Sequence, residues 1–328
     1  MTDTRDAAHG WGRPVPLPHF KVELSPPDLS AWLPGNTGVA GFTSYAAEAS
    51  GPHVVLLGLT HGNELSGAIV LDRLLRAGLR PERGRLTFGF ANIAAFDSFD
   101  PAQPTASRFV DEDLNRLWDP AVLDGPRHSR ELDRAREMRP MIDTADVLVD
   151  LHSMLWPSDP LILCGTTPRG RALAQAMGTP GLAIADSGHL SGRRLIDYDR
   201  FGTPGGSAHA VLVEAGQHWA RDTVTTSLAS VAGTLRFTNT VTTHPALPAR
   251  RPPPGRYAEV TDVVTATTGA FAFMRGFQGG EIVPRRNTVI ALDGETEIRT
   301  PYDNCLLVMP NLRPSRGHTA VRLARIVP

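Results

Sequence analysis

The apolar positions of this chain form short buried runs that alternate with helical patterns along its first two thirds. Runs predicted to be buried strands occupy residues 54–57, 86–91, 145–151, 160–164, 183–186 and 210–213. After residue 64, Ile69, Leu71, Leu74 and Leu75 are spaced to bury one face of a helix. Similar helical patterns cover 129–142, 169–177 and about 222–237. Strands that alternate with helices predict an α/β fold in which a mixed central sheet is flanked by helices.

The pattern changes after residue 242. Residues 243–256 are a Pro-rich linker that cannot continue a helix. Beyond them, short alternating runs separated by Gly, Pro, Asp and Asn predict a small all-β domain at 257–328. We expect residues 1–242 to form the larger domain, with 1–50 as a leader that adds an edge strand. A chain of 328 residues is long enough for such a pair of domains.

Composition excludes several classes of protein. Hydrophobic residues at 41% and charged residues at 20% are typical of a globular protein. The formal net charge of −1 does not favour binding to nucleic acid or to an anionic membrane surface. The N-terminal region has no apolar signal core, and no run approaches the roughly 18 apolar residues of a membrane span. Cys164 and Cys305 are too few for a disulfide framework and lack metal-ligand spacing, so we expect a reducing, cytoplasmic location.

Ionisable side chains follow three of the predicted strands at their carboxyl ends, where open α/β sheets place their ligands. These side chains are His61, Glu64, His152 and Glu214. Two histidines and one carboxylate make a catalytic zinc site that leaves a position open for water, which the metal activates while it polarises a carbonyl. Glu214 would act as general acid/base, provided that it is not itself a ligand. Asp150, two residues before His152, would hold that ligand in place.

Each of these signals is weak alone. The spacing His-x-x-Glu is common by chance, a histidine such as His152 is often a satisfied polar residue, and Glu214 could pair with one of many arginines. Their occurrence together, in this order and each at a strand end, favours the metal site.

Four short motifs add a family resemblance. They are H-G-N-E at 61–64, D-L-N-R at 113–116, D-L-H at 150–152 and V-E-x-G at 213–216. Over residues 51 to about 240 the chain resembles the aspartoacylase and succinylglutamate desuccinylase family, a branch of the zinc carboxypeptidase-like superfamily. The resemblance implies that fold, and a small β domain after a linker fits it. It also implies one zinc ion per chain, held by His61, Glu64 and His152, with Glu214 as general acid/base.

The resemblance also assigns roles to three polar residues. Arg108 lies where the family keeps the arginine that stabilises the oxyanion of the tetrahedral intermediate, and Asn115 and Arg116 lie where it binds the substrate's α-carboxylate. A planar, permanent cation suits bidentate carboxylate binding, and a cation aimed at developing negative charge stabilises a transition state. The alternative for both arginines is a surface salt bridge with the acidic residues 111–113.

Substrate recognition is expected in the segment 186–209, where the family reads the acyl group. Candidates for recognition, some of which are expected to be structural, are Arg193, Arg194, Tyr198 and Arg200. His189 and His218 are candidates for the pocket lining, and Trp156 is either a pocket wall or a core residue.

These observations predict a zinc-dependent hydrolase that cleaves the amide bond of a small N-acyl amino acid or related amide. The expected partner is a small-molecule substrate, and neither nucleic acid nor a membrane is expected to bind. The sequence is compatible with a homo-oligomer. One alternative is a metallocarboxypeptidase acting on peptide C-termini, which a β domain roofing the active site would disfavour. Another is a non-catalytic binding protein that retains the fold, which the complete set of ligands disfavours. The sequence does not specify the acyl group or the amine.

Overall fold

The computed structural model of the chain describes residues 19–188, 191–249 and 255–327. The first part contains β1 (Phe42–Ala46), β2 (His53–Gly58), α1 (Leu65–Arg76), β3 (Arg85–Phe90), α2 (Ile93–Phe96), η1 (Leu114–Arg116), α3 (Pro120–Leu123), α4 (Arg130–Asp143) and β4 (Val147–Met154). It continues with β5 (Leu161–Leu163), α5 (Pro168–Met177), β6 (Leu182–Ala185), η2 (Leu195–Asp197), α6 (Asp199–Gly202), β7 (His209–Gln217) and α7 (Asp222–Phe237). The C-terminal β region holds β8 (Arg256–Thr265), β9 (Phe271–Phe273), β10 (Ile282–Val283), β11 (Val289–Asp293), β12 (Thr296–Arg299), β13 (Cys305–Val308) and β14 (Thr319–Val327).

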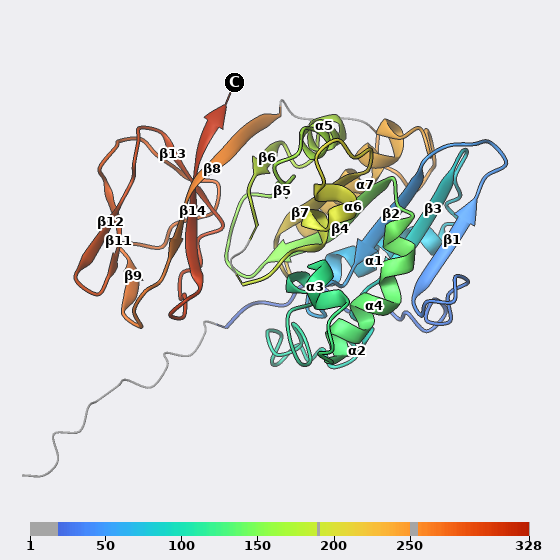
Figure 1. The fold of residues 1–328 in the computed structure, drawn as a ribbon, viewed down its shortest axis with the longest axis horizontal. Coiled ribbons are helices and arrows are strands. Elements are labelled where there is room, and N and C mark those ends of the chain that lie inside the picture. The colour runs from blue at the N-terminus through green and yellow to red at the C-terminus, as the bar shows by residue number, and fades with distance from the viewer. Residues whose placement is uncertain (1–18, 189–190, 250–254, 328) are drawn as a thin grey trace, which may run out of the picture.

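The fold is a mixed α/β sheet flanked by helices, with a β region at the C-terminus, as the sequence pattern predicts (Figure 1). Eleven strands form one sheet in the order β1-β3-β2-β4-β7-β5-β6-β8-β14-β13-β10. Strands β3, β2, β4 and β7 are parallel neighbours, whereas β1 at the edge runs antiparallel to β3. Strands β12, β11 and β9 form a second, three-stranded sheet.

The central strands are buried on both faces, which explains their continuous apolar sequences. Alternate residues of β2 enter different cores: Val54 and Leu56 pack in one, and Val55 and Leu57 pack in the other. Apolar residues of α1, α5 and α7 belong to the first core, and those of α4 belong to the second. Helices therefore cover both faces of the central strands of the sheet.

The C-terminal β region continues the central sheet. Strand β8 pairs in parallel with β6, and β14 pairs antiparallel with β8. We keep the division into 1–242, a linker at 243–256 and a β domain at 257–328 as a proposal. Within it, residues 1–18 and 250–254 lie outside the described residues. The shared sheet holds the two proposed domains in a fixed arrangement.

Two features of the strands differ from the sequence-based expectation. His152 and Glu214 lie inside β4 and β7 rather than beyond their ends, because both strands continue for several residues. Strands β10 and β12 were not expected, since two- and four-residue strands with partly exposed side chains carry no clear alternation.

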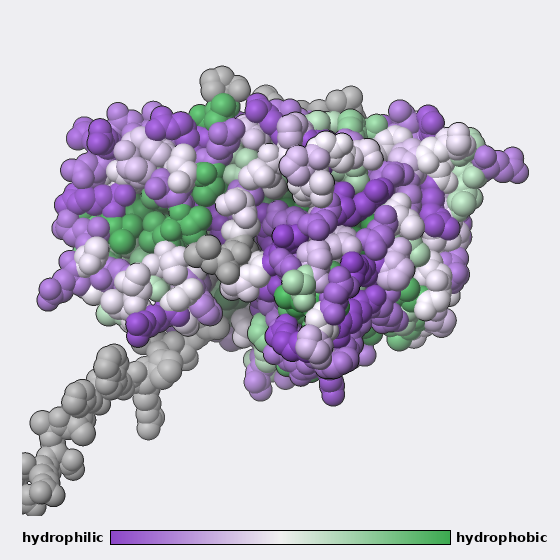
Figure 2. Space-filling view, viewed as in Figure 1, coloured by the Kyte–Doolittle hydropathy of each residue, from purple (hydrophilic) through white to green (hydrophobic). Residues whose placement is uncertain are grey.

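The surface of the C-terminal β region includes apolar side chains, among them Val263, Met274 and Leu292. Figure 2 shows apolar surface gathered over this part of the molecule. Among the helices in the described ranges, none combines the length and apolar character needed to cross a bilayer.

Candidate functional site

The loop after β2 presents the first two candidate ligands. His61 lies in the turn that follows Gly58, and Glu64 is the N-cap residue of α1. Gly62 separates them in sequence, and a Cβ atom there would lie 2.4 Å from the backbone of Ala95 and Phe96. The H-G-N-E motif therefore needs glycine at this position, because the turn packs directly on the backbone of α2.

His152 and Glu214 are direct neighbours across two parallel strands. They are paired in the register of β4 and β7, and a β-bulge follows between His152 and Met154. A bulge redirects side chains at the end of a strand pair. The result is that one ligand atom from each of His61, Glu64 and His152 lies within 4.8 Å of the others, with all three side chains buried.

The donor set fits a divalent transition metal. The Nδ1 atoms of His61 and His152 lie 2.7 Å and 3.0 Å from the two carboxylate oxygens of Glu64. The opposite ring nitrogens face carboxylates: His61 Nε2 is 3.0 Å from Asp113 Oδ1, and His152 Nε2 is 2.8 Å from Asp150 Oδ2. A carboxylate close to Nε2 favours a proton on that nitrogen, which would leave the Nδ1 lone pair for a metal. These residues therefore match the chemistry of a two-histidine, one-carboxylate site.

The charges of the cluster support each other. Burial by itself would raise the pKa of Glu64, but His61 and His152 outweigh it and hold that pKa well below its usual range. Burial would lower the pKa of His152, and Asp150 and Glu64 instead raise it well above normal. Burying three ionisable groups together costs free energy unless each group has a partner. The pairing within this cluster therefore favours a functional site over an incidental contact.

Glu214 is a buried carboxyl group beside His152. Its Oε2 atom is buried and has no hydrogen-bond partner among the residues that the structure describes. Burial, with a further contribution from the charge of Glu64, raises the pKa of Glu214 to about 8. A carboxyl group with a free oxygen and a pKa near neutrality is suited to accept and return a proton.

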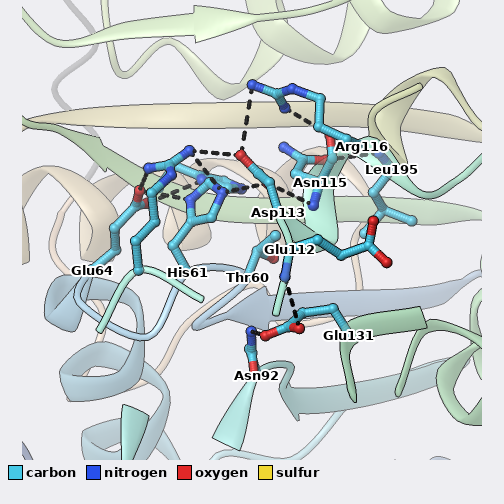
Figure 3. A network of polar contacts seen from close by, with 12 residues as sticks. Thr60, His61, Glu64, Asn92, Glu112, Asp113, Asn115, Arg116, Glu131 and Leu195 are labelled. Atoms are coloured by element: carbon cyan, nitrogen blue, oxygen red, sulfur yellow. Dashed lines mark hydrogen bonds and ion pairs between the residues drawn. The ribbon is translucent and has the colours of Figure 1, made fainter. Parts of the chain in front are cut away.

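A network of arginines and Asp113 borders the cluster (Figure 3). Arg108 Nη2 donates to Asp113 Oδ2 at 3.1 Å, and Arg108 Nη1 donates to Glu64 Oε1 at 3.4 Å. Arg116 Nη2 lies 3.8 Å from the same Asp113 oxygen, and its Nη1 donates to the carbonyl of Asn115. Asn115 Oδ1 accepts the backbone N–H of Leu195 at 2.8 Å, which leaves the amide NH2 group as the donor. The D-L-N-R motif thus places two cations and one amide beside the candidate metal ligands.

The buried carboxylate of Glu131 holds the loop that carries this network. Its Oε1 accepts the backbone N–H of Val110 and the side chain of Asn92, and its Oε2 accepts the backbone N–H groups of Asp111 and Glu112. Figure 3 shows Glu131 and Asn92 beneath the segment that leads to Asp113. One side chain of α4 therefore fixes the backbone between Arg108 and Asp113.

The candidate ligands and several of the polar groups around them line one cavity of about 180 Å³. Its lining includes the three candidate ligands together with Glu214, Arg108, Asn115, Arg116, Arg194, His218 and Trp156. Burial lowers the pKa of His218 to about 4, so its ring is neutral at physiological pH. The C-terminal β region contributes Met309, Pro310, Asn311 and Arg322 to the same lining.

Three candidates for substrate recognition lie elsewhere. Arg193 pairs with Asp119 and Asp199 at the surface. Tyr198 donates its hydroxyl to Asp143 Oδ1 at 2.7 Å. Arg200 donates to the carbonyl of Ala145. None of the three is part of the cavity lining described above. His189 lies outside the described residues.

Two residues of the candidate site were missed in the sequence. Asp113 lies in a recognised motif, and the signal for it was its position five residues after Arg108, since both side chains contact His61 Nε2. Arg322 reaches the cavity from β14, where it pairs with the buried Asp186 at 2.8 Å. No local pattern marks that contact, because the two residues are far apart in the chain.

Comparisons with known proteins agree with this geometry. Residues 50–183 match the family model of the succinylglutamate desuccinylase/aspartoacylase catalytic domain. A probable aspartoacylase of Parasynechococcus marenigrum (strain WH8102) is 30% identical over 138 residues, which are 40% of this chain and 44% of that protein. A succinylglutamate desuccinylase of Ectopseudomonas mendocina (strain ymp) is 34% identical over 105 residues, 31% of this chain and 28% of that protein. The chain thus spans less than half the length of these curated relatives.

A similar fold exists among solved structures. The crystal structure of a succinylglutamate desuccinylase/aspartoacylase from Rhodobacter sphaeroides superposes with a TM-score of 0.63 at 21% identity, covering 88% of this chain and 89% of that one. This likeness extends over the C-terminal β region as well as the α/β part. Residues 50–183 therefore carry the catalytic-domain pattern of the succinylglutamate desuccinylase/aspartoacylase family, which confirms the resemblance expected from the motifs.

Proposed function

We propose that the protein is a zinc-dependent hydrolase that cleaves the amide bond of a small N-acyl amino acid. The observation that carries the proposal is the convergence of His61, Glu64 and His152 on one point of a buried cavity, with Glu214 beside them. The names of the relatives support a deacylase rather than another use of the fold. A zinc ion held by these three residues would polarise the scissile carbonyl and make a water molecule more acidic.

Glu214 moves the proton in this proposal. Its free Oε2 atom accepts a proton from the attacking water and delivers it to the leaving nitrogen. Burial raises the pKa of this carboxyl group, which favours its holding the proton before delivery to the leaving nitrogen. Asp113 and Asp150, which lie beside Nε2 of His61 and His152, would favour the ring state in which each Nδ1 is available to a metal.

The arginines bind charge at two positions. Arg108, which contacts both Glu64 and Asp113, stabilises the negative charge that develops on the carbonyl oxygen. Arg116 and the amide of Asn115 bind the α-carboxylate of the substrate, because a guanidinium and a directed N–H donor match its two oxygens. The C-terminal β region closes one side of the cavity and excludes long peptides, which argues against a carboxypeptidase.

The test of this proposal is a pair of variants. Glu214→Gln should retain zinc, measured by elemental analysis, and lose activity on N-acyl amino acids by about 10²–10⁴-fold. His61→Ala should lose the metal itself. Near-normal turnover by Glu214→Gln would show that another group moves the proton, and amino-acid release from a peptide panel without deacylation would favour the carboxypeptidase.

A second pair of variants tests the carboxylate site. Arg116→Ala should raise KM for substrates that bear an α-carboxylate. Arg193→Ala is the matched control, since its guanidinium pairs with surface aspartates outside the cavity lining and its loss should leave KM unchanged. An unchanged KM in Arg116→Ala would mean that the substrate has no carboxylate at this position.

A further inference from the structure

On the basis of this proposed function, we infer that the substrate carries a single carboxylate and an otherwise apolar group, and that Asp186 and Asp197 exclude a second carboxylate. The inference rests on how the four arginines of the cavity are paired and on the composition of the opposite wall. It distinguishes this chain from a hydrolase selective for N-acyl derivatives of aspartate or glutamate.

The deeper pair of arginines is already neutralised within the protein. Arg194 lies 2.5 Å from Asp186 through Nη2 and 2.6 Å from Asp197 through Nε. Arg322 lies 2.8 Å from the other oxygen of Asp186. Arg194, Arg322 and Asp186 are each at most 3% exposed. Together with the partly exposed Asp197, these residues form a cluster of two cations and two anions, which has no formal net charge.

A second substrate carboxylate would add a third anion to this cluster. Burying an extra charge without a matching partner is unfavourable, because the group loses its hydration and gains no net attraction. Arg194 still has one buried nitrogen, Nη1, with no hydrogen-bond partner in the described part of the chain. Since Arg194 already pairs with Asp197 and shares Asp186 with Arg322, a neutral oxygen is a sufficient acceptor for that N–H group.

The outer pair of arginines is different. Asp113 is shared, lying 3.1 Å from Arg108 but 3.8 Å from Arg116. Burial and the neighbouring arginines, only partly offset by Asp113, together lower the pKa of Arg116 to about 10. Arg116 is therefore the cavity arginine whose positive charge is least neutralised by protein carboxylates. One substrate carboxylate bound to it would neutralise that charge.

Much of the remaining wall of the cavity is apolar. Its apolar members include Met154, Leu155, Trp156, Leu163, Leu212 and Met309, and the uncharged polar side chains of Ser153, Ser158, His218 and Asn311 line the same cavity. Trp156 is held in place by a hydrogen bond from Nε1 to Asn311 Oδ1 at 2.9 Å. These apolar side chains stabilise an aliphatic or aromatic group, and none of the wall residues named here carries a positive charge that would balance a second carboxylate.

The experiment compares substrates on the zinc-loaded protein. N-acetyl-L-leucine and N-acetyl-L-phenylalanine should be hydrolysed with kcat/KM at least tenfold higher than N-acetyl-L-aspartate or N-succinyl-L-glutamate. Calorimetric binding of the same compounds to Glu214→Gln should follow the same order without turnover. If kcat/KM for the dicarboxylates were equal to or higher than that for the two apolar substrates, the inference would fail, but the proposed function would stand. If the protein neither hydrolyses nor binds any of the four, the proposed function fails as well.

A charge variant tests the mechanism of exclusion. Asp197→Asn removes one negative charge beside Arg194 at a side chain that is 23% exposed, so folding should tolerate it. The ratio of kcat/KM for N-acetyl-L-aspartate to that for N-acetyl-L-leucine should rise by about tenfold. Asp199→Asn is the control, because Asp199 pairs with Arg193 at the surface. A folded Asp197→Asn protein with an unchanged ratio would show that the aspartates do not exclude the second carboxylate.

Discussion

Replacing Glu131 with glutamine would separate the support of the active-site loop from the chemistry itself. Glu131 touches none of the candidate ligands, yet its carboxylate accepts four hydrogen bonds, three of them from consecutive backbone N–H groups at 110–112. It is 1% exposed. Glutamine has nearly the same shape but replaces one acceptor oxygen with a donor, so in either orientation two N–H donors would face an NH2 group.

The magnitude follows from those two donors. A buried donor left without an acceptor costs about 1–3 kcal/mol, so the upper limit for the pair is roughly 6 kcal/mol. Asp111 is exposed, and water can reach its backbone, so we expect a loss near the lower end, about 2–3 kcal/mol in the free energy of unfolding. Because the loop carries Arg108 and leads to Asp113, kcat should fall and KM should rise together.

Urea denaturation and steady-state kinetics measure the two effects. Glu137→Gln is the matched control, since Glu137 lies on the same helix, has a side chain 44% exposed and pairs with Arg134. Its effect on stability should stay within about 0.5 kcal/mol. If Glu131→Gln also stayed within that range and kept normal kinetics, the loop would be held by other contacts and our account of Figure 3 would be wrong.

Three further predictions concern metal binding, pH and thiols. Asp150→Asn should weaken zinc affinity about 10–100-fold in competition with a chelator, because His152 Nε2 loses its carboxylate partner; unchanged affinity would remove Asp150 from the site. Burial raises the pKa of Glu214 from 4.5 to about 8, so its stabilising contribution is complete below the unfolded value and is lost as pH rises through about 8. The free energy of unfolding of the metal-free protein should therefore fall between about pH 5 and pH 8, and Glu214→Gln should reduce that fall in denaturant titrations; parallel curves would contradict this. Burial raises the pKa of Cys164 to about 12 and that of Cys305 to about 11, so a thiol reagent should label them rapidly only after unfolding, and fast labelling of the native protein would count against their burial.

The fold class and the candidate metal ligands were accessible from sequence because their signals are local. A continuous apolar run followed by H-G-N-E defines β2 and its turn without reference to the rest of the chain. Parallel strands then bring their carboxyl ends to one edge, so His152 and Glu214 come close to His61 as a consequence of topology. The ends of β4 and β7 were misplaced, since the buried polar residues inside them look like strand termini in a hydrophobicity pattern.

The recognition segment shows where local signals end. Arg193 and Arg194 are adjacent and chemically identical, yet one pairs with surface aspartates and the other is buried in the cavity wall. The segment around them has no regular period, so nothing in the sequence decides which side chain points inward. Their environment depends on Asp186 and Asp197, which are themselves placed by the irregular loop.

Arg322 shows why the C-terminal β region cannot be treated as an accessory to the site. In sequence, an arginine within V-R-L-A-R-I suggests the solvent face of an amphipathic strand. In the structure β14 lies between β8 and β13, and β8 is joined to the catalytic part through β6. That continuity brings Arg322 to Asp186, which lies just after β6 and also holds Arg194. The charge balance that we assign to substrate selection is therefore divided between the two proposed domains, and the sheet that joins them determines its geometry.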